Sequence, residues 1–406
     1  MAVGEGLTGV LLPIAGVDIG VAQAGIKRVG RTDLVVFRLA DGARTAGVFT
    51  TNAFCAAPVQ VAKAHLQSQP PQLWLINTGN ANAGTGARGL KDANDSCQEL
   101  GRLTDLPSES VLPFSTGVIG EYLPMDRLLA GLPNALDDLK ADNWQAAARG
   151  IMTTDTRPKG LSCEIELDGE RIRITGIAKG SGMIKPNMAT MLSFVATDAK
   201  VAPALLDSLL RDAVNASFNR ITVDSDTSTN DACMLVATGQ AAVSEIDSPQ
   251  HPSYDAFRDA LIDVMRGLAH EIVRDGEGAT KFIEIAVEQA ASTDEALAVA
   301  YTIAHSPLVK TALTASDANW GRILAAVGRS GLADLDVDKV DIWLDDIQIV
   351  AQGERAADYT EAAGSAVMRQ EELTIRVVLN RGPVADRVWT TDLSYEYIRI
   401  NAEYRT

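Results

Sequence analysis

The sequence predicts a mixed α/β fold in which hairpin-rich sheets are layered with helices. Short apolar runs of strand length alternate with longer amphipathic runs that have the helical period. Two pairs of strand-like runs are separated by only two turn residues, Asp168-Gly169 and Asp345-Asp346, as in tight β-hairpins. At 406 residues the chain can form two domains or one large α/β unit.

The N-terminal part of the chain predicts several strands and one helix. Strands are expected at residues 33–39 (DLVVFRL), 46–51 (AGVFTT), 73–77 (LWLIN) and 109–118, and a helix at 91–103 (KDANDSCQELGRL). Since the helical pattern starts only at residue 91, we expect the strands before it to form a meander without a crossover helix. The run from Glu109 to Pro124 ends in a glycine-flanked turn. Backbone amides in such a turn can converge on a developing oxyanion.

The rest of the chain alternates between helices and strands. Helices are expected at 127–139, 144–149, 202–216 and 254–274, with a further helical region that ends near Ala326. Strands are expected at 282–288, 372–380 and 386–393, in addition to the two hairpins. We find no internal repeat, low-complexity tract or flexible linker.

Composition and charge exclude several classes of protein. The net charge of −17, from 53 acidic and 36 basic side chains, does not suit nucleic acid or an anionic membrane. No apolar run approaches the ~20 residues of a membrane span, and no basic residue precedes Lys27 to form a secretory signal. Neither the four histidines nor the four cysteines have metal-ligand spacing, so we expect no metal and reduced thiols in a cytoplasmic protein.

The stretch from Lys179 to Leu192, KGSGMIKPNMATML, carries the most specific chemical hypothesis. A loop rich in turn residues feeds into an apolar run, MLSFVAT, immediately after Ala189 and Thr190. An autoprocessing nucleophile requires this arrangement: the Thr190 hydroxyl attacks the Ala189 carbonyl, and hydrolysis of the resulting ester frees the Thr190 α-amine. That amine then serves as the general base. On the local pattern alone, the favoured interpretation is a loop followed by a strand that begins with a β-branched residue.

Two other patterns suggest ligands that we set aside. Gly84, Gly86 and Gly89 spell GxGxxG, but the first glycine lies seven positions beyond Asn77 and not directly at a strand exit, so a dinucleotide site is disfavoured. The polar run from Asp224 to Asp231 lacks the order of an EF-hand calcium loop. We interpret it as a turn-rich segment packed near the nucleophile.

KGSGMIKPNMATML resembles the self-cleavage region of the ornithine acetyltransferase family of arginine biosynthesis. The sequence motifs AGIK, NTGNANAGTG and SDANWGRI are also similar to those of the family, and the resemblance extends from about Ala24 to Thr406. The family implies an αββα arrangement like that of N-terminal-nucleophile enzymes. It also implies cleavage between Ala189 and Thr190 into an α-chain, 1–189, and a β-chain, 190–406, that fold together.

The resemblance also assigns roles to individual residues. It implies that Thr190 is the nucleophile and that Thr116 and Gly117 form the oxyanion pair. The substrate-binding positions that it implies are Thr153, Lys179, Thr190, Glu277, Asn401 and Thr406. A lysine ammonium is a compact charge suited to the α-carboxylate of a substrate, and the Glu277 carboxylate suits its amino group.

The activity implied is ping-pong acetyl transfer from N-acetylornithine to glutamate, without cofactor or metal, by an α2β2 heterotetramer. Some relatives also use acetyl-CoA as donor, and the resemblance favours such a bifunctional enzyme. Two other functions stay open at this point. An N-terminal-nucleophile aminopeptidase or amidase would use the same groups with water as acceptor. A nucleotide-binding regulatory module would rest on the GxGxxG pattern.

Overall fold

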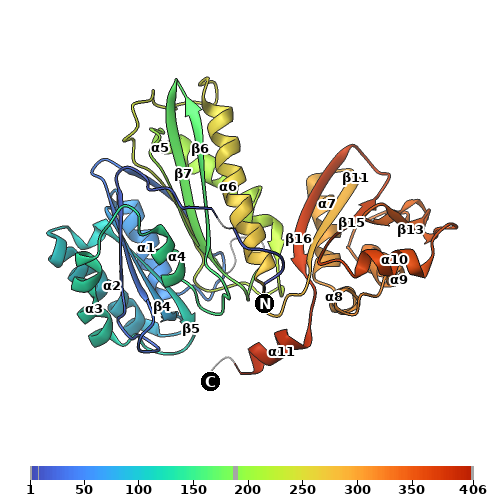
Figure 1. Cartoon of the computed structure of the whole chain (residues 1–406), viewed down its shortest axis with the longest axis horizontal. Helices are drawn as coiled ribbons and strands as arrows, with labels where there is room; N and C mark the ends of the chain where they lie inside the picture. Colours follow the sequence, from blue (N-terminus) through green and yellow to red (C-terminus); the bar gives the residue numbers. More distant parts are fainter. Residues whose placement is uncertain (1, 8, 186–190, 404–406) are drawn as a thin grey trace. The chain divides into compact units, whose positions relative to one another are not determined.

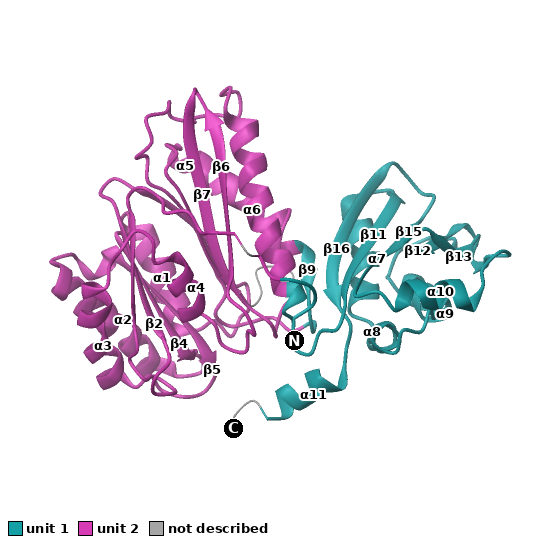
Figure 2. Cartoon of the chain, viewed as in Figure 1, with its two compact units in different colours: residues 1–5, 220–225, 273–406 teal, residues 6–219, 226–272 magenta. Residues whose placement is uncertain are grey.

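The computed structural model describes residues 2–7, 9–185 and 191–403, and the chain forms two compact units (Figures 1 and 2). The larger unit, unit 2 in Figure 2, comprises residues 6–219 and 226–272. The smaller unit, unit 1, comprises residues 1–5, 220–225 and 273–406. None of the helices in the described part is both long and apolar enough for a membrane span.

Two sheets form the centre of the larger unit. One has the strand order β1-β2-β4-β5 and the other the order β3-β10-β8-β7-β6. The strands of the first sheet are β1 (Val17–Ala22), β2 (Leu34–Leu39), β4 (Leu73–Asn80) and β5 (Val111–Val118). Those of the second are β3 (Arg44–Phe49), β6 (Lys159–Leu167), β7 (Glu170–Lys179), β8 (Leu192–Thr197) and β10 (Ala232–Ala237).

An aromatic cluster joins the two sheets. Phe37 and Trp74 of the first sheet lie with ring centroids 5.6 Å from that of Phe194 in β8, and Phe114 meets the same ring edge-on at 5.1 Å. Such tilted and edge-to-face contacts stabilise a core beyond the area that they bury. The sheets therefore pack face to face, and Phe194 fixes the strand that follows position 190 in the core of the larger unit.

Helices cover both outer faces of this sandwich. On the first sheet, leucines of α2 and α3 pack on Leu34, Leu75 and Val111. On the second sheet, α6 lies close to β7: a Cβ added to Gly176 of β7 would be 2.9 Å from the Leu268 side chain of α6. The helices of this unit are α1 (Ala57–Ser68), α2 (Gly86–Thr104), α3 (Met125–Asp137), α4 (Trp144–Gly150), α5 (Pro203–Asn215) and α6 (Tyr254–Arg274). Figure 1 shows the resulting α/β/β/α layers, which confirm the predicted fold class.

The five-stranded sheet mixes strands from both sides of position 190. β3, from the first part of the chain, pairs along its whole length with β10. β7 pairs antiparallel with β8, with Lys179 opposite Leu192. Because strands that precede position 190 pair with strands that follow it in one hydrogen-bonded sheet, each part completes the other.

The topology corrects one expectation for the N-terminal part. The strands at residues 34–39 and 44–49 do not continue one meander, because β2 pairs in the first sheet and β3 in the second. After these strands, the chain crosses over through α2, since β4 and β5 are parallel and parallel neighbours need a crossover connection. Strand β1 and helix α1 were not predicted from the sequence.

The smaller unit is built on one seven-stranded sheet of order β14-β13-β12-β15-β11-β16-β9. Its strands are β9 (Ile221–Thr222), β11 (Phe282–Ala290), β12 (Asp341–Leu344), β13 (Ile347–Ala351), β14 (Glu354–Arg355), β15 (Glu372–Val378) and β16 (Val384–Thr391). Its helices are α7 (Thr293–Ala304), α8 (Pro307–Thr314), α9 (Trp320–Gly328), α10 (Glu361–Met368) and α11 (Tyr395–Ala402). The SDANWGRI motif contains the beginning of α9. Its Asn319 is the N-cap residue, whose side chain accepts a hydrogen bond from the Arg322 N–H.

Candidate active site

Thr116 and Gly117 lie at the carboxyl end of β5, beside an irregular step in β4. Gly117 stands opposite Gly79, and the register then shifts so that Asn80 faces both Thr116 and Val118. Gly117 has φ +137°, and a Cβ there would lie 2.3 Å from the carbonyl carbon of Gly79. Only glycine fits such a conformation and approach. The backbone geometry at the predicted oxyanion pair therefore depends on the glycine at position 117.

A small pocket brings two of the predicted site residues together in the larger unit. Thr116 and Lys179 both line it, although 63 positions separate them in the chain. Met191, which directly follows the predicted nucleophile, also faces this pocket. The full lining consists of Thr116, Lys179, Met191, Leu192, Ser228, Asn230 and Asp231.

Asp155 fixes Lys179 at the edge of this pocket. Its carboxylate lies 3.9 Å from the Lys179 ammonium and 2.6 Å from that of Lys159. It also accepts hydrogen bonds from the N–H groups of Thr153 at 2.9 Å and Gly180 at 2.8 Å. Thr153, a third predicted site residue, is thus joined to Lys179 through a carboxylate that the sequence analysis did not single out.

The Asp155 cluster is a buried set of charges. The side chains of Asp155 and Lys159 are fully buried, and that of Lys179 is 6% exposed. Burial raises the pKa of Asp155, but the two ammonium groups and the hydrogen bonds lower it by more, so that its pKa lies below the ordinary value of a carboxyl. The result is a fixed carboxylate that orients the Lys179 ammonium.

The polar segment predicted to pack near the nucleophile does line the pocket. Asn230 is buried, and its side-chain amide donates to the backbone carbonyls of Ala81 at 2.6 Å and Ser115 at 2.9 Å. Ser228 accepts a hydrogen bond from the Thr50 hydroxyl through its carbonyl at 2.7 Å. These contacts tie the segment to the end of β5, next to Thr116. Within the described residues, no group of three His, Cys, Asp or Glu side chains is arranged to hold a metal ion.

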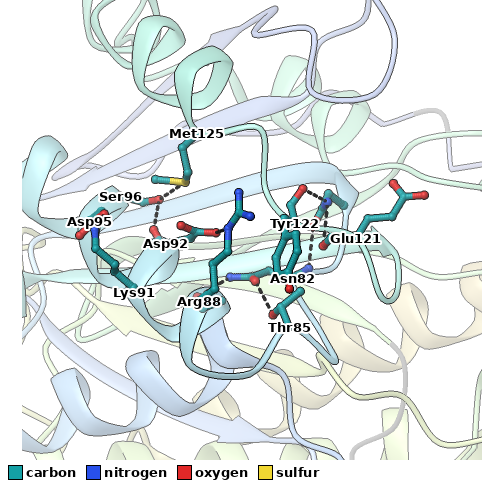
Figure 3. Close-up of polar contacts among 12 residues, drawn as sticks. Asn82, Thr85, Arg88, Lys91, Asp92, Asp95, Ser96, Glu121, Tyr122 and Met125 are labelled. Carbon is teal, nitrogen blue, oxygen red and sulfur yellow. Dashed lines mark hydrogen bonds and ion pairs between the residues drawn. The ribbon is translucent and has the colours of Figure 1, made fainter.

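The loop that contains the GxGxxG pattern is filled by its own side chains (Figure 3). The Asn82 amide donates to the carbonyl of Gly89 at 2.9 Å, and Asn82 accepts from the Thr85 hydroxyl at 2.8 Å. A Cβ on Gly89 would lie 1.8 Å from the Thr85 hydroxyl oxygen. The third glycine of the pattern therefore makes room for the Thr85 side chain of the protein itself. The β4-α2-β5 crossover does have the topology of a nucleotide-binding unit.

Two further predicted residues meet in the smaller unit. The Asn401 amide, on α11, donates to the Glu277 carboxylate at 2.8 Å. Next to Glu277, Gly278 has φ +68°, and a Cβ there would be 2.4 Å from the Tyr397 nitrogen. α11 therefore packs directly on the turn that carries Glu277. The predicted residues Ala189, Thr190 and Thr406 lie outside the described residues.

Comparison with known proteins decides the family. The sequence pattern of the ArgJ family matches residues 18–406. The chain belongs to the ArgJ family. It is 57% identical, over all 406 residues of both chains, to an arginine biosynthesis bifunctional protein ArgJ of Pseudomonas fluorescens. It is 59% identical to another from Methylococcus capsulatus, over 98% of this chain and 97% of that protein. The ArgJ-family chain is thus an enzyme of arginine biosynthesis, which confirms the resemblance drawn from KGSGMIKPNMATML.

Solved structures of similar proteins include a bifunctional protein ArgJ from Bacillus halodurans. The two proteins are 41% identical, with a TM-score of 0.48. The match covers 50% of this chain and 95% of the Bacillus halodurans chain. An ornithine acetyltransferase from Mycobacterium tuberculosis, complexed with ornithine, is 32% identical with a TM-score of 0.38, over 44% of this chain and 95% of that chain.

Proposed function

We propose that the chain transfers the acetyl group of N-acetylornithine to glutamate through an ester on Thr190. Membership of the ArgJ family over residues 18–406 carries this proposal. The pocket lined by Thr116, Lys179 and Met191 supports it, because it joins a strand-end backbone and a cation with the residue that follows Thr190. No metal or cofactor is required by this chemistry.

The enzyme first cuts itself. The Thr190 hydroxyl attacks the Ala189 carbonyl carbon, the peptide C–N bond breaks, and water then hydrolyses the ester. Cleavage leaves a carboxylate on Ala189 and a free amine on Thr190. In the five-stranded sheet, β3 and β7 of residues 1–189 pair with β10 and β8 of residues 190–406, so the two chains stay associated. We place this enzyme in the cytoplasm as an α2β2 heterotetramer.

Acetyl transfer then takes two steps at one nucleophile. Thr190 Oγ, whose proton passes to its own α-amine, attacks the acetyl carbonyl of N-acetylornithine. The C–N bond breaks, and the ornithine amine leaves with that proton. The amine of glutamate attacks the ester next, and Thr190 regains its hydroxyl. Thr116 and Gly117 stabilise the tetrahedral oxyanion in both steps. Acetyl-CoA acts as a second donor, from which free coenzyme A leaves as the thiol.

The substrate-binding roles follow the chemistry of each group. Lys179, held by Asp155, binds the α-carboxylate that both amino acids share, and Thr153 contributes beside it. In the smaller unit, Glu277 and Asn401 are hydrogen-bonded to each other and offer a carboxylate and an amide for the substrate amino group. Thr406 completes this proposed set.

Mass spectrometry of the acetylated enzyme tests the proposed reaction. Incubation with N-acetylornithine alone should add one acetyl group to the fragment that begins at Thr190, and glutamate should then remove it as N-acetylglutamate. Initial rates should give the parallel lines of a ping-pong mechanism. Release of acetate at the same rate with and without glutamate would instead identify a hydrolase.

Replacing Gly117 with alanine should lower kcat by roughly 10²–10³-fold, the cost of losing one oxyanion donor. The new Cβ would collide with Gly79 and displace the backbone at the end of β5. Gly120→Ala is the matched control, because Gly120 also has a positive φ, +84°, but no atom within 4 Å of the added Cβ. Equal losses of kcat in the two variants would show that backbone strain alone accounts for the effect. Thermal unfolding of both variants identifies any general loss of stability.

A further inference from the structure

The loop from Gly25 to Arg31 is strongly basic in an otherwise acidic chain. Lys27, Arg28 and Arg31 lie within five residues and Arg127 joins them, since its guanidinium donates to the Gly25 carbonyl at 2.8 Å. The chain as a whole has a net charge of −17. Four cations gathered in one place therefore form a local field of the opposite sign, which favours an anion.

The protein holds this loop in a fixed shape. The carboxylate of Asp33, which is buried, accepts hydrogen bonds from the N–H groups of Ala24 at 2.7 Å and Ile26 at 2.6 Å. At the other end, Arg31 donates to the carbonyl of Met152 at 2.5 Å. Lys27 and Arg28 are exposed between these two anchors. The loop thus presents two cations on an ordered backbone, which reduces the entropic cost of binding a ligand.

The loop also lies against the candidate oxyanion step. Lys27, Arg28 and Arg31 line a small pocket together with Asp33, Thr78 and Gly79. Gly79 has φ +98°, and a Cβ there would lie 2.8 Å from the Lys27 Cβ. Since Gly79 stands opposite Gly117 in the parallel β4–β5 pair, the basic loop and the predicted acetyl-binding backbone are neighbours in the larger unit.

We propose that the 25–31 loop, with Arg127, is a subsite for the phosphate groups of a coenzyme A thioester donor. Lysine and arginine together are the groups that proteins use to bind phosphate. N-acetylornithine has no phosphate, whereas acetyl-CoA carries several, joined to its thioester by a flexible arm. This inference rests on the proposed use of acetyl-CoA as second donor. The carboxylates of glutamate are the other anions that the loop could meet.

Steady-state kinetics with two thioester donors test the subsite. The variant Lys27→Gln/Arg28→Gln is compared with the wild type using acetyl-CoA and using S-acetylpantetheine, which carries the same thioester without phosphate. The control is Arg171→Gln/Arg211→Gln, which removes two cations with exposed side chains elsewhere in the larger unit. Arg31 is left unchanged because it anchors the loop. N-acetylornithine is assayed in parallel with each enzyme.

We expect kcat/KM for acetyl-CoA to fall about tenfold or more in the loop variant, since each charged hydrogen bond to phosphate is strong. The value for S-acetylpantetheine should fall by a much smaller factor, and raised salt should weaken acetyl-CoA use mainly in the wild type. Equal falls for all donors, as expected if the loop binds glutamate, would overturn the proposal. So would no fall at all, or a wild type that uses no thioester. The N-acetylornithine assay shows separately whether the proposed acetyl transfer stands.

Discussion

Replacing Thr190 with alanine is expected to leave the chain whole and to abolish acetyl transfer. The hydroxyl is the attacking group in both self-cleavage and acetylation, and cleavage is what creates the free amine that acts as base. Removing a nucleophile of this kind costs on the order of 10⁶-fold in kcat. Denaturing mass spectrometry should show fragments of 189 and 217 residues for the wild type and only the intact chain for the variant.

The control for this experiment is Thr190→Ser, which keeps a hydroxyl and should still cleave. Native size-exclusion chromatography of the wild type should recover both fragments together, because β3 pairs with β10 and β7 with β8 across the cut. A Thr190→Ala protein that is cut at the same bond would assign cleavage to another group. An uncut wild type with full activity would remove the free amine from the mechanism.

Local sequence signals predicted the elements that depend on local chemistry. The turn residues Asp168 and Gly169 both have positive φ, +54° and +80°, as a type I′ hairpin requires, and β6 pairs with β7 in register on either side of them. Helix α6 has the bounds that its amphipathic period indicates. The apolar run after position 190 forms β8, whose burial fits its composition.

Sheet partners could not be read from the same signals. β2 and β3 are similar apolar runs separated by a short turn, yet they enter different sheets, because the partners that each buries against come from distant parts of the chain. β3 pairs with β10, about 190 residues later. Helix α1 has a weakly patterned sequence and is positioned largely by packing, so periodicity did not reveal it.

The role of Asp155 could have been found from the hairpin. A two-residue turn at 168–169 sets the register that places Lys159 opposite Ala178, so the backbones of Lys159 and Lys179 are neighbours at the same end of the hairpin. Two lysines at adjacent buried positions require a carboxylate, and Asp155 lies four residues before Lys159. The resemblance alone pointed to Thr153 and Lys179 and passed over the residue that connects them.

Asp155→Asn is expected to be the most destabilising single change at this site. The carboxylate is the anion between two ammonium groups, at 2.6 Å and 3.9 Å, whose side chains are 0% and 6% exposed. Breaking a buried ion pair by removing one partner typically costs about 3–5 kcal/mol, because the remaining charge stays buried. Urea unfolding at pH 7 should therefore show a clearly lower midpoint. Lys179 also loses its anchor, so kcat/KM should fall for every donor.

Two controls separate this charge effect from a general disturbance. Asp207→Asn removes a carboxylate from an exposed pair with Arg211 and should cost under about 1 kcal/mol. Adding Lys159→Met to Asp155→Asn removes one of the uncompensated charges and should recover part of the lost stability. If the double variant were no more stable than Asp155→Asn, local packing and not charge would explain the loss.

The pH dependence of unfolding gives an independent check on Asp155. Its pKa is lowered in the folded state, mainly because the two lysines and the hydrogen bonds outweigh its burial. The carboxylate therefore contributes its full stability above the unfolded pKa of about 4, and this contribution is lost only as the pH falls through the lower folded pKa. The difference in unfolding midpoint between wild type and Asp155→Asn should stay constant from pH 8 to 5 and narrow below 4. A difference that narrows already between pH 7 and 5 would mean that Asp155 is not held as a carboxylate by its lysines.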